Sequence, residues 1–240
     1  MKTASNSEQK KVSKTTKTQS ETPGERLFVD MLSVSKHKSL GGARVWLAAV
    51  DDATGCTWGH LTEKKSHAPK NLRTLARRLN DRGNPVKCTR MDDAGELKKF
   101  AEDCKGATKE CPRKIQVEHT SRDSPQFNGK VERKTAVITR RIKSALNAAR
   151  LTEDLRKGLW GEVAMNLTDI ENTLLSQSCS KPAYVAFFER ELQGVKNFRQ
   201  FGEVACVKFG DKMKGKLANR GAPTMCLGRS RDHAADAADS

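Results

Sequence analysis

Three acidic residues in separate parts of the chain could act together on a phosphate. Asp30 and Asp92 each follow an apolar run typical of a β-strand, at residues 27–29 and 86–91, and Glu132 lies in a basic segment typical of a helix start. Carboxylate oxygens are the ligands that Mg²⁺ and Mn²⁺ prefer in proteins. If the fold brings the three carboxylates together, they could hold two divalent ions and support phosphoryl chemistry.

Each of these acids also has a purely structural interpretation. An aspartate at a strand end often begins a turn or caps a helix, and Glu132 could pair with Arg133 or Lys134 on a solvated helix face. A further acidic pair, Asp51 and Asp52, lies in a turn-rich segment and is explained as turn residues. The order of the three candidate acids along the chain favours the catalytic interpretation.

The elements that must position these acids follow the order β-β-β-α-β-α-β-α. Periodicity and turn residues predict them over 27–32, 45–50, 56–61, from a cap at Ser66 to near Gly83, 86–91, 95–104, 115–119 and from Ser124 onward. Ser124 as N-cap and Pro125 at the first helical position make a good helix start. Two later helices, at about 153–176 and 182–192, are predicted to cover the core or to mediate self-association.

The helix that carries Glu132 has distinct sides. One side is apolar and holds Val131, Ile138, Ile142, Ala145 and Ala149. Glu132 lies about 100° away, at the edge of that side, where it can lean over the strand ends. Another side is basic and holds Lys130, Lys134 and Arg141, with Arg133 and Arg140 next to them. We expect the basic residues to contact DNA beside the active site.

Several blocks resemble a known family. Phe28-Val29-Asp30, Asp92-Asp93-Ala94-Gly95-Glu96 and residues 120–134 are similar to the catalytic core of retroviral and retrotransposon integrases, most of all the copia (Pseudoviridae) type. Four later blocks match copia-type polyproteins in the same order, namely Leu159-Trp160-Gly161-Glu162, Lys181-Pro182-Ala183-Tyr184, Phe198-Arg199-Gln200-Phe201-Gly202 and Cys226-Leu227-Gly228. The resemblance covers roughly residues 23–233.

The resemblance implies an α/β, ribonuclease H-like fold, with a mixed five-stranded sheet flanked by helices. In that fold the first and fourth strands are adjacent, so Asp30 and Asp92 become neighbours. The implied chemistry is DNA integration by metal-dependent polynucleotidyl transfer, in which one site trims element 3′ ends with water and then joins them to target DNA. The implied cofactor is two Mg²⁺ or Mn²⁺ ions, Asp30 bridging both, Asp92 binding one and Glu132 the other.

The resemblance also implies partners and a location. Double-stranded DNA, both element ends and target, is the expected partner, and we expect a homo-oligomer. The expected location is nuclear, with a cytoplasmic particle before import as the alternative. The expected DNA-binding residues are Asn128 and Gly129, from the loop before the family's glutamate, and Lys130, Arg133, Lys134 and Arg141.

The sequence departs from the family in ways that keep other functions open. Phe127 stands where the family usually has Gln, and Asp93 where it usually has Asn. The His/Cys zinc module that normally precedes the core is missing, as are the protease and the reverse transcriptase, which suggests a fragment or a degenerate, domesticated copy. The alternatives are therefore an inactive DNA-binding relic and a ribonuclease H-like nuclease that hydrolyses without joining.

Composition agrees with a nucleic-acid partner. The 240 residues carry a formal net charge of +16 and a pI near 9.7, and clustered Lys and Arg gain affinity for a phosphate backbone by releasing counterions. No apolar run approaches the roughly 18–20 residues that span a bilayer, so we expect no membrane partner. Seven cysteines without a CxxC pair indicate neither a zinc ribbon nor a disulfide framework, which favours a reducing intracellular compartment.

The chain divides into three predicted regions. Residues 1–22 are rich in Lys, Ser, Thr and Gln and are expected to form a disordered basic tail. Residues 23–190 are assigned to the catalytic core. Residues 191–240 are assigned to a basic C-terminal extension, partly β, that contacts DNA or is a solvated tail.

Overall fold

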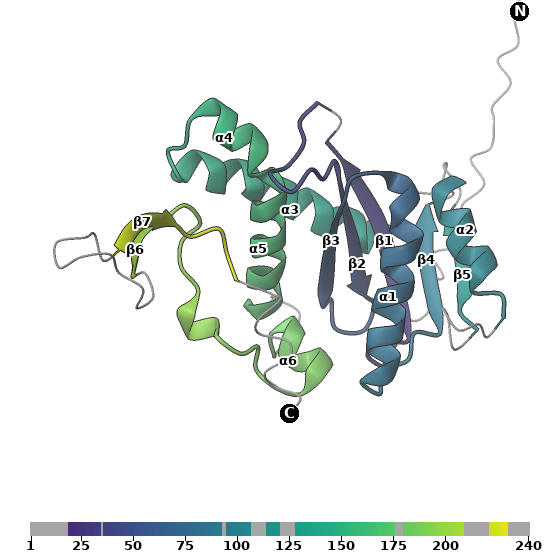
Figure 1. Ribbon diagram of the computed structural model, residues 1–240. Coiled ribbons are helices and arrows are strands. Elements are labelled where there is room, and N and C mark those ends of the chain that lie inside the picture. The colour runs from purple at the N-terminus through teal and green to yellow at the C-terminus, as the bar shows by residue number, and fades with distance from the viewer. Residues whose placement is uncertain are drawn as a thin grey trace, which may run out of the picture.

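A five-stranded mixed sheet with helices on both faces forms the centre of the molecule (Figure 1). The computed structural model describes residues 19–34, 36–92, 95–106, 114–120, 128–175, 180–208 and 221–229. The first part of the chain forms β1 (Arg26–Ser33), β2 (Val45–Asp51), β3 (Thr57–Thr62), α1 (Ala68–Asp81), β4 (Cys88–Asp92), α2 (Gly95–Asp103) and β5 (Gln116–Thr120). The second part forms α3 (Gly129–Ala148), α4 (Glu153–Gly158), α5 (Trp160–Thr173), α6 (Ala183–Phe188), β6 (Val204–Lys208) and β7 (Gly221–Met225).

The strand order in the sheet is β3-β2-β1-β4-β5. β1 runs antiparallel to β2 and parallel to β4, and β4 runs parallel to β5. The predicted order of elements and the predicted adjacency of the first and fourth strands are therefore confirmed.

Alternation along the strands divides the core into two clusters, one on each face of the sheet. Leu27 and Val29 of β1 pack with α1 and α2, whereas Phe28 between them packs with α3 and α5. Every residue of β2 is buried, because both of its faces are covered. The apolar side predicted for α3 is confirmed, since Val131, Ile138 and Ile142 are buried in the second cluster.

Several predicted boundaries are wrong. The predicted strand 27–32 is correct to within one residue, but Asp30 does not lie at a strand end, because β1 pairs with β2 as far as Ser33 opposite Val45. The helix predicted over 153–176 is two helices, α4 and α5, with the buried Leu159 at the break between them. α6 ends at Phe188 and not near 192, because Glu189 adopts a left-handed backbone conformation. Ser66 does not cap α1, since it lies in the 3₁₀ turn Lys65–His67 that precedes the helix.

α5 packs closely on β3 through two glycines. A Cβ at Gly59 of β3 would lie 3.1 Å from Thr168 Oγ1 and 3.2 Å from Met165 Sδ of α5, and a Cβ at Gly161 of α5 would lie 3.1 Å from Leu61 Cδ1 of β3. At the end of α5, the Asn172 amide brackets the start of β3: Thr57 N–H donates to Asn172 Oδ1 at 2.8 Å, and Asn172 Nδ2 donates to the Thr57 carbonyl at 2.7 Å. Because Gly59 and Gly161 carry no side chain, α5 can lie close to the sheet and cover it. Covering the core was one of the two roles predicted for this helix.

The predicted C-terminal extension contains a hairpin of β6 and β7, which extends beyond α5 (Figure 1). The base of the hairpin is tied to the second core cluster by Phe201, Met225 and Leu227. Most of the predicted N-terminal tail, residues 1–18, lies outside the described residues, as do 209–220 and 230–240. No helix in the described ranges is long and apolar enough to cross a membrane.

Candidate active site

Asp30 and Asp92 lie side by side where the parallel pairing of β1 and β4 ends. The last paired residues are Val29 and Met91, and an aspartate follows each. Neighbouring strands are about 4.8 Å apart, so the two carboxylates are attached to adjacent backbone positions. Asp30 is half-buried and Asp92 is exposed. Met31 N–H donates to Asp30 Oδ1 at 2.8 Å, which leaves Oδ2 for another ligand.

Both aspartates belong to the sheet face that α3 covers. Asp30 is two residues beyond Phe28, which packs in the cluster with α3. Asp92 is two residues beyond Arg90, whose guanidinium lies over the Phe28 ring at 5.4 Å. Because side chains alternate along a strand, all four share one face. A residue at the start of α3 is therefore on the same side of the sheet as the two carboxylates.

Glu132 lies in the first turn of α3, next to the fully buried Val131, and its side chain is exposed. Over the described residues, no three His, Cys, Asp or Glu side chains are close enough together to form a metal-binding group. Ser124, Pro125 and Phe127, predicted to start this helix, and Asp93 beside Asp92 lie outside the described residues. The role of Glu132 as the third metal ligand therefore stays a prediction.

Three of the predicted DNA-binding residues do not lie beside Glu132. Lys130, Lys134 and Arg141 are roughly 160–200° around α3 from Glu132, because sequence neighbours on a helix diverge by about 100° per residue. Lys130 Nζ lies 2.5 Å from Asp52 Oδ1, and Lys134 Nζ lies 3.1 Å from Glu171 Oε2. Arg141 also pairs with Glu171. These three cations thus make internal ion pairs on the side of α3 away from Glu132, and their contact with DNA stays a prediction.

Other cations are closer to Glu132 in angle around α3. Arg133 is exposed, and its Nε donates to the Gly129 carbonyl at 3.1 Å. Arg140 and Lys143 are also exposed and lie roughly 80° and 20° around the helix from Glu132. The sequence analysis missed Lys143, although the helical period would have placed it on the flank of Glu132.

Asn128 and Gly129 occupy the start of α3. Asn128 is buried, and its Oδ1 has no hydrogen-bond partner within the described part of the chain. At Gly129 a Cβ would meet no atom within 4 Å, so the protein itself does not require glycine there. The assignment of Asn128 and Gly129 to DNA binding stays a prediction.

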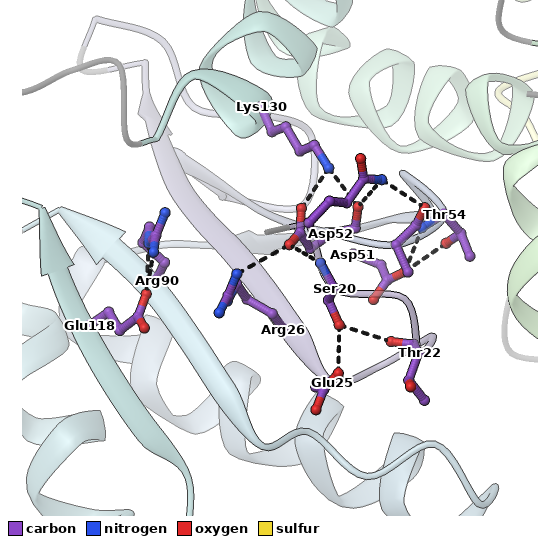
Figure 2. Close-up of polar contacts among 12 residues, drawn as sticks. Ser20, Thr22, Glu25, Arg26, Asp51, Asp52, Thr54, Arg90, Glu118 and Lys130 are labelled. Carbon is purple, nitrogen blue, oxygen red and sulfur yellow. Dashed lines mark hydrogen bonds and ion pairs between the residues drawn. The ribbon is translucent and has the colours of Figure 1, made fainter. Parts of the chain in front are cut away.

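The acidic pair in the turn after β2 has two different roles (Figure 2). Asp51 is fully buried and accepts hydrogen bonds of 2.8 Å from Gly24 N–H, Thr54 N–H and the Thr54 hydroxyl, as a turn residue should. Burial raises the pKa of the Asp51 carboxyl, and the hydrogen bonds from Thr54 and Gly24 oppose that rise. The turn interpretation of Asp51 is confirmed.

Asp52 is more than a turn residue, because it also contacts three other segments of the chain. Its buried carboxylate accepts from Ser20 N–H at 2.8 Å, lies 3.4 Å from Arg26 Nη1 and pairs with Lys130 (Figure 2). It joins the segment before β1, β1 itself and the first turn of α3. Residues 19–22, predicted as the end of a disordered tail, are part of this contact.

Asp51→Asn should lower the free energy of unfolding by about 1–3 kcal/mol, because an amide NH₂ would face a backbone N–H and leave a buried donor unpaired. Urea unfolding followed by circular dichroism measures it. The matched control is Asp81→Asn at the exposed end of α1, for which a change within about 0.5 kcal/mol is expected. Equal stability of the two variants would contradict the structural role of Asp51.

Comparison with known proteins agrees with the geometry. No protein-family model matches the chain. It is 24% identical over 211 residues to the retrovirus-related Pol polyprotein from transposon TNT 1-94 of Nicotiana tabacum, a match that covers 84% of the chain and 15% of the polyprotein. The chain therefore spans only a small part of that relative's length.

Solved structures that are similar to the chain include two from retroviral proteins. A chain of the simian T-cell lymphotropic virus intasome in complex with PP2A regulatory subunit B56 gamma has a TM-score of 0.52 at 16% identity, covering 89% of this chain and 72% of that one. The HTLV-2 integrase catalytic core domain in complex with magnesium (trimeric form) has a TM-score of 0.48 at 14% identity, covering 69% of this chain and 97% of that one. The sequence resemblance and the predicted ribonuclease H-like fold are confirmed.

Proposed function

We propose that this chain, a relative of a retrotransposon Pol polyprotein segment with the fold of an integrase catalytic core, joins element DNA 3′ ends to target DNA by polynucleotidyl transfer. The observation that carries the proposal is the placement of Asp30 and Asp92 on adjacent parallel strands, on the face that α3 covers.

The donor set suits a hard divalent cation. Asp30 and Asp92 offer neighbouring carboxylate oxygens, and Glu132 is exposed at the start of the helix on the same face. We propose that these three residues hold Mg²⁺ or Mn²⁺, two ions in all. When bound, the ions supply neutralisation of the negative charge on the attacking and leaving oxygens.

The chain's own residues would hold the duplex. Arg133, Arg140 and Lys143 are exposed around the flank of α3 that carries Glu132, where they can neutralise phosphates on either side of the scissile bond. We propose that Asn128, whose Oδ1 has no hydrogen-bond partner among the described residues, contacts the DNA end. Joining two element ends to one target requires two active sites, so we also propose a homo-oligomer acting in the nucleus.

One observation favours a second candidate, an inactive DNA-binding relic. The three acids do not form a metal-binding group among the described residues. A strand-transfer and disintegration assay on duplex ends in Mg²⁺ or Mn²⁺, with EDTA as the blank, separates the two. Joining that EDTA abolishes supports the enzyme, and duplex binding without joining in either metal supports the relic.

DNA affinity should depend strongly on salt. Log affinity is expected to fall linearly with log salt at about −0.9 per phosphate neutralised, and changing Arg133, Arg140 and Lys143 together to Gln should make the slope shallower by roughly 2–3. Fluorescence anisotropy of a labelled duplex across salt concentrations measures both. The matched control changes Lys70, Arg77 and Arg78 to Gln. These residues are on α1, which covers the face of the sheet opposite α3. An equal effect from the control triple would contradict the assigned DNA face.

Neutralising Lys130, Lys134 and Arg141 is not an equivalent test. These cations pair with Asp52 and Glu171, which are 3% and 8% exposed. Removing them would leave the buried Glu171 carboxylate without Lys134 and Arg141 and Asp52 with Arg26 alone, which would destabilise the fold. Any loss of DNA binding in that variant would report on stability.

A further inference from the structure

A groove of about 510 Å³ lies along the flank of α3 opposite Glu132. We call it the α3–α5 groove. Its sides are α3 and the residues that follow α5, and the turn after β2 closes one end. Its volume lies within the roughly 300–1,000 Å³ typical of ligand sites. Of the residues that line it, only Arg133 also takes part in the proposed DNA-joining function.

The groove carries an excess of positive charge. Five cationic side chains line it among the described residues, namely Lys130, Arg133, Lys134, Arg141 and Lys181, against two carboxylates, those of Asp52 and Glu171. Lys134 and Arg141 share the single carboxylate of Glu171, and Lys130 uses that of Asp52. Burial lowers the pKa of Lys134, and the nearby charge of Arg141 lowers it further. The internal carboxylates thus do not balance the cations, and an added anion would be stabilised.

The same groove exposes large aliphatic side chains. Leu174 is 44% exposed and Leu175 is 67% exposed, directly after α5. Val137 of α3 also lines the groove. No aromatic ring lines it within the described ranges, so it offers no stacking surface for bases. Aliphatic side chains beside cations match a ligand that combines carboxylates with apolar groups.

We propose that the α3–α5 groove binds a short acidic peptide segment of a partner protein, whose carboxylates pair with the surplus cations and whose apolar side chains cover Leu174 and Leu175. Charge complementarity selects the acidic residues and the two leucines select the apolar ones. Nucleic acid would satisfy the charge but leave the leucines in water. This binding needs no catalysis, so it stands or falls separately from the DNA-joining function.

The test uses the full chain and a fluorescein-labelled synthetic peptide of roughly ten residues that combines Asp, Glu and Leu. Anisotropy should show saturable binding. The paired change Leu174→Ser with Leu175→Ser should weaken it by about tenfold or more, since the buried apolar contact is lost. Lys181→Glu should weaken it several-fold, and more at low salt. Asp92→Asn should bind the peptide as the wild type does.

The controls match each change. Leu40→Ser alters another leucine, 63% exposed, and Lys70→Glu reverses a charge on α1, and neither should change binding. Companion peptides with Leu replaced by Ser, or with the acids replaced by their amides, should each bind at least several-fold more weakly.

Three results would overturn the proposal. One is no binding at about millimolar peptide. Another is competition by duplex DNA that does not depend on Leu174 and Leu175, which would assign the groove to nucleic acid. The third is a change in oligomeric state of the leucine variant without a change in peptide affinity, which would make the groove a contact between copies of the chain.

Discussion

Asp92→Asn is expected to abolish metal-dependent DNA joining while duplex affinity stays equal or rises slightly. Asparagine keeps the shape of the side chain but loses the charge that holds a divalent ion. Outer-shell partners of a metal ligand are already worth about 10–100-fold, so losing a direct ligand should cost more than roughly 100-fold. Strand-transfer rates and duplex anisotropy, measured on the same preparation in Mg²⁺ and in Mn²⁺, give the two readouts.

Asp81→Asn is the matched control, since it makes the same chemical change at an exposed helix end on the other side of the sheet. Full activity of Asp92→Asn would show that the site is wrongly assigned. An inactive wild type in both metals would favour the relic. Glu132→Gln in the same assay tests the third ligand, and a loss as large as that of Asp92→Asn is expected.

Gly59→Val is expected to destabilise the protein by about 3 kcal/mol or more, the upper range for overpacking. Valine favours strands, so the local preference alone would stabilise β3. Packing opposes it: the new Cβ would lie 2.5 Å from Nε1 of the fully buried Trp46, with Thr168 and Met165 of α5 at 3.1 and 3.2 Å. Because Trp46 has no free space to move into, packing is expected to outweigh propensity.

Urea unfolding measures the effect, and Gly41→Val is the control. A Cβ at Gly41 would meet only Ser39 Oγ at 3.9 Å, so this change should stay within about 1 kcal/mol of the wild type. A wild-type midpoint for Gly59→Val would mean that α5 does not pack on β3 as closely as the structure has it.

Much of the fold could be predicted from the sequence because its signals are local. Apolar runs and turn residues located the five strands of the sheet, and the helical period identified the buried side of α3. The break at Leu159 could not be predicted in this way. Leu159 is helix-compatible and fully buried, and its role depends on the sheet against which α4 and α5 pack.

Only part of the candidate site could be predicted, again because tertiary contacts leave no local pattern in the sequence. The neighbourhood of Asp30 and Asp92 follows from strand order, which the resemblance implied. The partners of Lys130 and Lys134 are Asp52 and Glu171, far away in the sequence, so no local pattern could show them. Lys143 was within reach of sequence reasoning, because the helical period places it about 20° around α3 from Glu132.

The bracket between Asn172 and Thr57 constrains the order in which the chain can fold. The two residues are 115 positions apart, and the Trp160 indole likewise reaches the His37 carbonyl across 123 positions. Contacts of such separation carry a large loop-closure cost and form late. During synthesis, β1, β2 and β3 emerge long before α5. Until α5 emerges, it cannot cover the apolar side chains of Trp46, Ala48 and Val50. A nascent chain in which the sheet formed before α5 would expose this apolar face, and aggregation or chaperone capture would then compete with folding.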